Sequence, residues 1–410
     1  MNLASFHVGA ADLPADPSDL FAAATAPRLL LWDDDGWWLA EGVAVEATAD
    51  GPGRYSWLGQ WAAVVRSHLG SDAPPVLVAA AFGEQDLSGT AWGAHLSAAR
   101  AWLPRRLRRW TPGISREWRC DEGATDVPAR SVFNTPVWPP IPADDATHYT
   151  DLVEDAVGLI RDGALKKVVL AHAVDEALPV PVDEASLIRR LRRPGCCAYA
   201  ADLDDGGLFL GTTPELLFSA EGNRLSTMAL AGTCAVGTDD ADTQTRIARL
   251  LASTKERKEH GLVLEHLVAV LRPRAAPFAV PPQPTPRRIG GLVHLESRLE
   301  VDLRRRDWFD LLAALHPTPA VCGLPAATAA HWLARREGLA RGLYSGVLAW
   351  LGPDSARAWV PLRGGIISND RSRARLFAGA GIIETSEPQR ELAETELKLA
   401  VMRGILTQPD

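Results

Sequence analysis

Strand-like and helix-like segments interleave along the last two thirds of this 410-residue chain, but without a strict βαβ rhythm. Residues 144–161 carry apolar side chains at helical spacing, and Lys167-Val-Val-Leu-Ala-His172 is a short apolar run typical of a buried strand. No repeat of fixed period occurs. Because a doubly wound parallel sheet requires the βαβ rhythm, the order of segments predicts an α+β fold with large, mainly antiparallel sheets covered by helices.

Other elements are predicted from local patterns. Apolar runs predict strands over residues 29–32, 76–81, 208–211, 346–351 and 358–362. Helical spacing predicts helices over residues 187–193, 239–271 and 326–336, the second as one long helix. The basic cluster Arg105–Trp110 is interpreted as the exposed face of a helix, and the proline-rich stretch Pro136–Pro142 as either a domain boundary or a crossing loop.

Composition and charge exclude several classes of protein. A formal net charge of −8 argues against a nucleic-acid-binding surface, and no uncharged apolar stretch approaches the roughly 18 residues of a membrane span. The N-terminus lacks the basic start and apolar run of a signal peptide. We therefore expect a cytoplasmic protein with no nucleic-acid or membrane partner. Its five cysteines form no CxxC pair, which favours reduced, mostly buried thiols at Cys120, Cys196, Cys197, Cys234 and Cys322.

Two segments place carboxylates on one face of a helix. After Ser386 and Pro388, which predict a helix start, Glu391, Glu394 and Lys398 follow at i, i+3 and i+7. The middle helix offers a second pair, Glu256 and Glu259. Carboxylates without imidazole or thiolate favour a hard cation, so two such faces could close on Mg²⁺. The alternative is that these glutamates are ordinary surface partners of neighbouring basic residues.

Other residues are candidates for acid–base chemistry or for binding an anion. Lys167 is either a snorkelling side chain beside a buried strand or a base whose pKa burial lowers, and Glu215 is either a helix cap or a carboxyl group that keeps its proton. Gly232-Thr233 offers backbone N–H groups at a glycine. Residues 379–381 (Gly-Ala-Gly) are interpreted as a glycine turn whose backbone can approach a ligand closely.

Nine motifs in this order resemble those of the chorismate-utilising enzymes, and of the isochorismate synthase branch in particular. The resemblance covers residues 145–400, and residues 1–140 carry no motif that matches. The motifs are Lys-Val-Val-Leu-Ala (167–171), Gly-Thr-Thr-Pro-Glu-Leu-Leu (211–217), Ala-Leu-Ala-Gly-Thr (229–233), Lys-x-x-x-Glu-His (255–260), His294-Leu, His-Pro-Thr-Pro-Ala-Val-x-Gly-x-Pro (316–325), Tyr-Ser-Gly (344–346), Gly-Ala-Gly-Ile-Ile (379–383) and Glu-x-x-Glu-Thr-x-x-Lys (391–398).

The resemblance implies a Mg²⁺-dependent isomerase, a hydroxymutase that converts chorismate to isochorismate. It implies that Lys167 is the general base that activates water and that Glu215 is the general acid that protonates the departing hydroxyl. Metal ligands would be Glu259 and Glu394 directly, with Glu256 and Glu391 acting through water. The residues implied to bind the substrate are Gly232, Thr233, His294, Tyr344, Arg363, Gly379, Ala380, Gly381 and Lys398.

The resemblance also bears on domains and on the subfamily. It implies one integrated domain, with residues 1–140 as an N-terminal part and residues 141–410 as the catalytic region. Ala231 stands where aminodeoxychorismate synthases carry a lysine nucleophile, and His316-Pro-Thr-Pro is unusual in anthranilate and salicylate synthases. His172 and Cys322 depart from the family pattern, so His172 could loosen the surroundings of Lys167.

Several alternatives stay open at this point. A salicylate synthase, which continues to pyruvate elimination, would use the same catalytic residues. A chorismate-binding protein without catalysis is a third reading, although retention of Lys167 and Glu215 argues against it. We expect a monomer or weak homodimer whose partner is a small molecule. The residues do not decide among menaquinone, siderophore and salicylate pathways.

Overall fold

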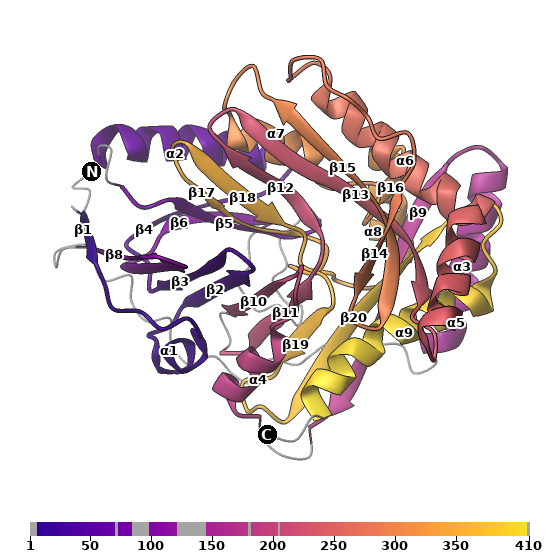
Figure 1. Cartoon of the computed structure of the whole chain (residues 1–410), viewed down its shortest axis with the longest axis horizontal. Helices are drawn as coiled ribbons and strands as arrows, with labels where there is room; N and C mark the ends of the chain where they lie inside the picture. Colours follow the sequence, from indigo (N-terminus) through magenta and orange to yellow (C-terminus); the bar gives the residue numbers. More distant parts are fainter. Residues whose placement is uncertain are drawn as a thin grey trace.

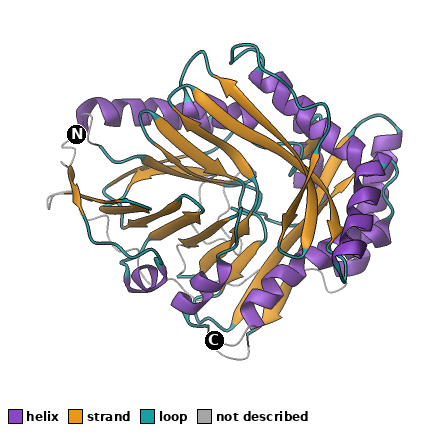
Figure 2. Ribbon diagram, viewed as in Figure 1, coloured by secondary structure: helices purple, strands orange, loops and turns teal. Residues whose placement is uncertain are grey.

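A computed structural model describes residues 6–69, 73–83, 98–120, 145–178, 182–203 and 206–407. It confirms the predicted α+β fold, because two large antiparallel sheets lie face to face and helices cover their outer sides (Figure 2). The connector Pro136–Pro142 lies outside the described residues.

The larger sheet has eleven strands and contains segments from both ends of the chain. Strand β2 from the N-terminal part pairs with β10, so the two parts of the chain share one sheet. In spatial order the strands are β1 (Phe6–Ala10), β8 (Ile114–Cys120), β7 (Arg106–Thr111), β3 (Gly36–Glu41), β2 (Arg28–Asp33), β10 (Cys197–Asp202), β11 (Leu208–Thr213), β19 (Gly364–Ile367), β20 (Arg373–Ile382), β9 (Lys167–Ala177) and β16 (Gly323–Leu324).

The second sheet has nine strands and mixes distant segments in the same way. Strand β5 pairs with β17, which follows it by more than two hundred residues. In spatial order the strands are β14 (Thr285–Ile289), β15 (Leu292–Asp302), β13 (Arg224–Ala235), β12 (Leu216–Glu221), β18 (Ser355–Trp359), β17 (Val347–Leu351), β5 (Val76–Ala80), β6 (Ala99–Leu103) and β4 (Val45–Ala49).

The helices lie on the outside of the sheets (Figure 1). Helices α2, α6 and α7 contribute to the core on one side of the nine-stranded sheet, whereas α1, α4 and α9 contribute to the core on the outer face of the eleven-stranded sheet. The bounds are α1 (Ser18–Ala23), α2 (Arg54–Leu69), α3 (Asp145–Arg161), α4 (Glu184–Leu191), α5 (Asp240–Ala252), α6 (Thr254–Leu271), α7 (Trp308–Leu315), α8 (Ala326–Arg336) and α9 (Pro388–Thr407). None of the helices in the described ranges is long and apolar enough to cross a membrane.

A third core joins the two sheets and positions the site. Leu348 and Trp359 of the nine-stranded sheet pack there with Tyr199, Phe209 and Phe377 of the eleven-stranded sheet. Burying aromatic side chains of this size supplies much of the packing energy between such layers. The facing sheets therefore form a rigid frame.

The single helix predicted over residues 239–271 is wrong, because the chain forms two helices. Ser253 has an extended backbone between α5 and α6, and its hydroxyl oxygen accepts a hydrogen bond from the Glu256 N–H at 3.3 Å. Ser253-x-x-Glu256 is the pattern of a capping box, a local signal that apolar periodicity alone does not detect. The break gives α6 its own N-terminus beside the site.

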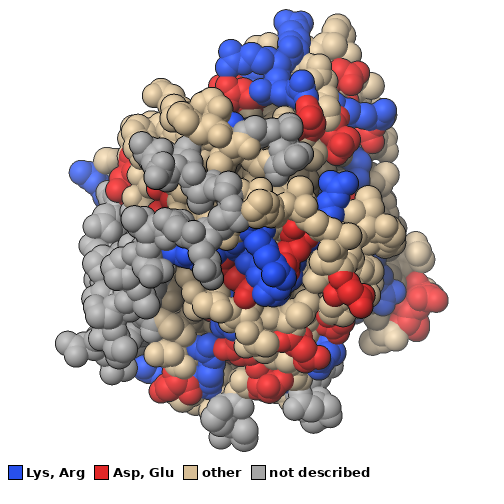
Figure 3. Space-filling model, turned by 90° about the vertical axis from the view of Figure 1, so that its left-hand side faces the viewer, with Lys and Arg blue, Asp and Glu red and all other residues tan. Residues whose placement is uncertain are grey.

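The basic cluster Arg105–Trp110 was also interpreted wrongly, since residues 106–111 form strand β7. Side chains alternate along it, and Arg108 is buried with ion pairs to Glu41 at 2.8 Å and Glu117 at 3.1 Å. This part of the cluster is therefore neutralised inside the protein. On the face shown in Figure 3, Lys and Arg side chains are interspersed with Asp and Glu.

Other predicted elements are confirmed with small shifts of their ends. The helices over residues 144–161 and 326–336 correspond to α3 and α8, and the run from Lys167 begins β9, which continues to Ala177. The strand predicted over residues 358–362 lies earlier, at Ser355–Trp359. All five cysteines are free thiols, and three of them are buried: Cys196, Cys197 and Cys322.

Candidate active site

A cavity lies between the two sheets, beside helices α6 and α9, and half of its lining residues were predicted from the sequence. It contains about 710 Å³ of space, counting its open mouth. Eleven predicted residues line it: Glu215, Gly232, Thr233, Glu259, His294, Tyr344, Arg363, Gly379, Gly381, Glu394 and Lys398. The other four predicted residues, Lys167, Ala380, Glu256 and Glu391, are not among its lining residues.

The interpretation of residues 379–381 as a turn is wrong, because they belong to strand β20. Gly379 pairs with Ala171 and Gly381 pairs with Val169 across the β20–β9 ladder. Side chains alternate along a strand, so Ala380 points away from the face that Gly379 and Gly381 present to the cavity. The glycines serve by leaving space in a strand rather than by forming a turn.

Lys167 begins β9 and has no solvent-exposed surface. Its ammonium nitrogen lies 3.0 Å from the Glu259 Oε1 of α6. A snorkelling lysine keeps its charged head in water, so this burial excludes that alternative. Lys167 is therefore held inside the protein against one of the predicted metal ligands.

Gly381 makes room for this pair. A Cβ atom built on Gly381 would lie 2.0 Å from the Glu259 Oε1 and 3.0 Å from the Lys167 Cε. The carboxylate would have to move, and the contact between Lys167 and Glu259 would move with it. Glycine at this position of β20 therefore leaves the space that the Glu259 carboxylate occupies beside Lys167.

Replacement of Gly381 by alanine is expected to lower kcat by up to about 10²-fold, because displacing a reacting group by about 1 Å can cost that much. Gly404→Ala in α9 is the matched control, since a Cβ there meets no atom within 4 Å. Steady-state kinetics of both variants check the prediction. Equal kcat values for the two variants would contradict it.

Glu215 lies in the short connection between β11 and β12 and is only 5% exposed. Its backbone N–H donates to the Thr213 Oγ1 at 3.1 Å, which fixes the start of this connection. Burial raises the pKa of the Glu215 carboxyl to about 8, although the positive charges of Lys167 and Arg363 oppose this. At neutral pH Glu215 therefore holds a proton that it can donate.

Four glutamates lie on α6 and α9, and most of them contact a lysine. Besides the Lys167–Glu259 pair, Lys255 lies 2.5 Å from the Glu391 Oε1. Burial raises the pKa of Glu391, and the Lys255 ammonium opposes this shift. Glu391 is almost completely buried, so it could not serve as an ordinary surface partner.

Glu394 and Glu256 differ in how they are compensated. Burial raises the pKa of Glu394, but the Lys398 ammonium at 2.7 Å, together with Lys255 and Arg363, brings that pKa below its ordinary value. Glu256 accepts a hydrogen bond from the Thr233 N–H at 3.2 Å. Burial and the negative charge of Glu259 nevertheless raise the pKa of Glu256 to about 7.

This donor set fits a hard cation in its chemistry. The charges of Glu259 and Glu394 both raise the pKa of Glu256, so carboxylates from α6 and α9 crowd one another. Within the described ranges, no three Asp, Glu, His or Cys side chains are gathered closely enough to form a finished metal site. Lysine ammonium groups neutralise the carboxylates of α6 and α9 in this structure, and a bound cation could take over that role.

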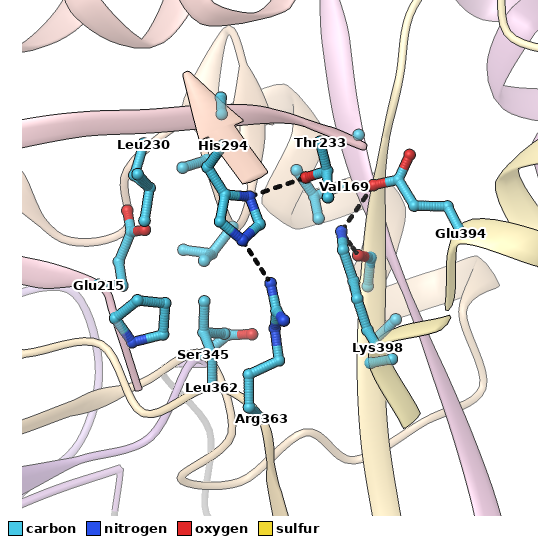
Figure 4. A pocket seen from close by; sticks show the side chains of 18 of the residues that line it. Val169, Glu215, Leu230, Thr233, His294, Ser345, Leu362, Arg363, Glu394 and Lys398 are labelled. Carbon is cyan, nitrogen blue, oxygen red and sulfur yellow. Dashed lines mark hydrogen bonds and ion pairs between the residues drawn. The ribbon is translucent and has the colours of Figure 1, made fainter. Parts of the chain in front are cut away.

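The opposite wall of the cavity carries donors for an anion (Figure 4). The Arg363 Nη2 lies 3.4 Å from the His294 Nε2, and the His294 Nδ1 lies 2.9 Å from the Thr233 Oγ1. Burial lowers the pKa of His294 well below its ordinary value, so the ring is neutral. Because arginine can only donate, Nε2 accepts and the proton resides on Nδ1, which donates to Thr233.

Arg363 itself keeps its guanidinium available. Among the residues that the structure describes, it has no carboxylate within ion-pair distance. Its backbone φ of +48° is unusual for a residue with a side chain, and such strain is concentrated at functional sites. Lys398 donates to the Gly379 carbonyl at 2.6 Å as well as to Glu394. The cavity therefore holds cationic groups suited to carboxylates.

Tyr344 completes this wall. Its ring stacks on Phe377 with centroids 5.1 Å apart, and burial raises the pKa of its hydroxyl to about 12, so it remains a hydrogen-bond donor. Its neighbours Ser345 and Arg341 also line the cavity, although the sequence analysis quoted Ser345 only within the Tyr-Ser-Gly motif and did not predict Arg341. Ser345 has a φ of +62°, a feature without a signal in its residue type. Arg341 and Glu337 are spaced like an ordinary surface pair on a helix.

The two departures from the family pattern lie in packed surroundings. The His172 Nδ1 of β9 lies 3.0 Å from the Thr395 Oγ1 of α9. Cys322 is fully buried, and its thiol is 3.7 Å from the Ala326 carbonyl oxygen. His172 thus connects the strand of Lys167 to the helix of Glu394.

Comparison with known proteins places this cavity in a family. Residues 129–407 match the model of a family described as chorismate binding enzyme. The chain is 33% identical over 271 residues to isochorismate synthase DhbC of Bacillus subtilis, covering 64% of this chain and 68% of that protein. It is 36% identical over 252 residues to a putative isochorismate synthase, MenF, of Mycobacterium tuberculosis, covering 59% of this chain and 68% of that protein.

Solved structures agree over nearly the whole chain. The structure of MenF, the menaquinone-specific isochorismate synthase from Escherichia coli, superposes with a TM-score of 0.80 and 27% identity, covering 98% of this chain and 95% of that one. The crystal structure of a putative isochorismate synthase, DhbC, from Bacillus anthracis gives a TM-score of 0.77 and 25% identity, covering 95% and 99%. The chain belongs to the chorismate binding enzymes.

Proposed function

We propose that this protein is an isochorismate synthase, an isomerase that converts chorismate to isochorismate. The observation that carries the proposal is Glu215, a buried carboxyl group whose pKa is raised to about 8 at the edge of a cavity that also holds cationic donors. Such a group is protonated at neutral pH and can act as a general acid. The names of the similar proteins support this assignment.

The reaction requires one proton to be taken and one to be given. Water attacks ring C2, and Lys167 is assigned as the base that takes the proton from that water. The ring double bonds shift as the C4–O bond breaks, and Glu215 gives its proton to the departing hydroxyl, which leaves as water. Chorismate and isochorismate have the same composition, so no oxidant or reductant is required.

The substrate carries two carboxylates that the cavity must bind. We assign one of them to Arg363 and the Tyr344 hydroxyl, with Lys398 and the backbone near Gly379 alongside. A guanidinium that has no carboxylate partner in the described protein can bind a carboxylate with charge-assisted hydrogen bonds. Neutral His294 does not compete for it, and orients the Arg363 side chain.

We assign Mg²⁺ to the glutamates of α6 and α9, with Glu259 and Glu394 as direct ligands and Glu256 and Glu391 acting through water. When bound, the ion supplies a hard positive charge for the second substrate carboxylate. The carboxylates would then exchange part of their contact with lysines for contact with the ion. Carboxylates that crowd one another without a cation are costly, which supports the assignment.

Water, rather than an enzyme side chain, is proposed as the nucleophile. Ala231 lines the cavity at the end of a regular stretch of β13, just before the bulge at Gly232, and its methyl group cannot attack. We also propose that the protein acts in the cytoplasm on a small molecule, as a monomer or weak homodimer. The pathway that uses the product stays open.

Incubation of the purified protein with chorismate and Mg²⁺ is expected to release isochorismate, and EDTA should abolish this activity. Chromatography of the mixture identifies the product, and lactate dehydrogenase detects pyruvate. Stoichiometric pyruvate with salicylate would identify a salicylate synthase instead. Binding of chorismate without turnover would identify a non-catalytic protein, and full activity in metal-free buffer would remove Mg²⁺ from the site.

A further inference from the structure

A buried ion pair, Glu337 with Arg341, lies at the wall of the cavity, where Arg341 is a lining residue, and it has no role in the proposed chemistry. The two side chains are only 3% and 2% exposed. The Arg341 Nε donates to the Glu337 Oε2 at 2.7 Å, and its Nη2 donates to the Oε1 at 2.5 Å. A buried pair of this kind is weak evidence for stability, since its desolvation offsets much of its attraction. Its position therefore needs another explanation.

The pair lies against the outer edge of β9. In the described part of the chain, β16 is the last strand of this sheet and pairs only with Lys167 and Val168. Beyond that point, the Ala171 N–H donates to the Glu337 Oε1 at 2.8 Å, and the Val169 carbonyl accepts from the Arg341 Nη2 at 2.6 Å. The two side chains thus supply an acceptor and a donor where a further strand would supply backbone groups.

The same arginine reaches two other walls of the cavity. Its Nη1 donates to the Val321 carbonyl at 2.8 Å, and its own carbonyl accepts from the Tyr344 N–H at 3.0 Å. Val169, Ala171, Val321 and Tyr344 all line the cavity. One residue therefore connects β9 and the segment after His316, through its side chain, with the turn that presents Tyr344, through its backbone carbonyl.

Direct binding of substrate by Arg341 fits the contacts less well. Its Nε, Nη1 and Nη2 all donate to protein oxygens, and Glu337 neutralises its charge. Its guanidinium carbon also lies 4.2 Å from the centre of the Phe82 ring. Arg363, in contrast, has no carboxylate partner among the described residues.

We propose that Glu337 and Arg341 are positioning residues that act as a surrogate edge strand for β9. They hold the strand that begins with Lys167 at a fixed distance from the Tyr344 turn and the 318–322 segment. Only the expected change in kcat rests on the proposed function. The hydrogen bond from Ala171 to Glu337 can be tested without any activity.

The test compares the double variant Glu337→Leu/Arg341→Met with a matched pair elsewhere. Arg28→Met/Asp202→Leu is the control, because that largely buried arginine, with a side chain 9% exposed, also pairs with a carboxylate that accepts a backbone N–H. The Asp202 pair lies on β2 and β10, away from the cavity lining. Arg341→Lys is a third variant, which keeps the charge and the Ala171–Glu337 bond but lacks the fork of donors.

The first readout is amide hydrogen exchange of the intact protein. We expect the Ala171 amide to exchange at least about tenfold faster in the double variant, with no such change in the control or in Arg341→Lys. Unchanged protection of Ala171 in a folded double variant would overturn the surrogate strand. This measurement does not depend on activity. If the wild-type protein does not turn over chorismate, that result contradicts only the proposed function.

The second readout is the division between kcat and KM. A misplaced Lys167 should lower kcat by about 10- to 10²-fold in the double variant and less in Arg341→Lys, with KM within about threefold of wild type. A raised KM with unchanged kcat would make Arg341 a substrate-binding residue instead. An equal loss of kcat in the control variant would show that the Glu337–Arg341 pair contributes only to the general stability of the fold. If the double variant does not fold, a wild-type kcat in Arg341→Lys would overturn the proposal.

Discussion

Replacement of Lys167 by methionine is expected to lower kcat by about 10²- to 10⁴-fold, the usual contribution of a group that transfers a proton in the transition state. Methionine has a similar length but cannot accept a proton. KM should change much less than kcat, because the carboxylates of the substrate are assigned to other residues. Steady-state kinetics with chorismate measure both constants.

Two further variants separate chemistry from structure. Lys166→Met is the control, because Lys166 is the exposed neighbour, whose backbone N–H donates to the Leu324 carbonyl. Lys167→Arg keeps a positive charge opposite Glu259 but stays protonated at working pH, so it should lose kcat as well. A Lys167→Met protein with near-normal kcat would return Lys167 to a purely structural role.

Glu215→Gln is expected to lower kcat by about 10²- to 10⁴-fold and, at the same time, to stabilise the fold at neutral pH. The folded pKa of Glu215 is about 8, whereas the ordinary value is 4.5. Between these values the folded protein retains a proton that the unfolded chain releases. Wild-type stability is therefore lost progressively as pH rises from 4.5 to 8, by roughly 3 kcal/mol at pH 7.

Thermal unfolding at several pH values checks this prediction. The variant should match wild type near pH 4 and become the more stable of the two as pH approaches 8, because glutamine has no proton to retain. Wild-type kcat should also fall above about pH 8, where Glu215 loses its proton. Glu221→Gln, at the exposed end of β12, should leave kcat unchanged. A stability difference that does not vary with pH would contradict the assignment of a raised pKa.

Local patterns predicted the elements whose periodicity is long and regular. Helix α3 and strand β9 were predicted because their apolar side chains repeat at helical spacing or form one buried run. The break at Ser253 was missed because the single helix was predicted from the apolar spacing of residues 264–271, which does not report on residues 253–261. A serine hydroxyl at Ser253 caps the second helix just after the first one ends. Arg108 was misplaced because an arginine pattern does not show which carboxylates will meet it inside the fold.

The candidate site was also predicted only in part. Motif order brought most lining residues together, but Gly379 and Gly381 were assigned to a turn because glycine favours turns. Their use in β20 depends on Glu259 and Tyr344 approaching from other elements, which no local pattern contains. The same holds for Arg363, whose backbone conformation is imposed by its neighbours, and for the Glu337–Arg341 pair, whose partner is the edge of β9.

The pairing of β5 with β17 has a consequence for how the chain is made. On a ribosome, Val76–Ala80 emerges long before Val347–Leu351, and at about 5–20 residues per second the delay is on the order of tens of seconds. During that time β5 presents an open edge, which the later strand β17 covers. Contacts between such distant segments also make folding slow. The fold therefore depends on protection of its first strands until its last strands have been synthesised.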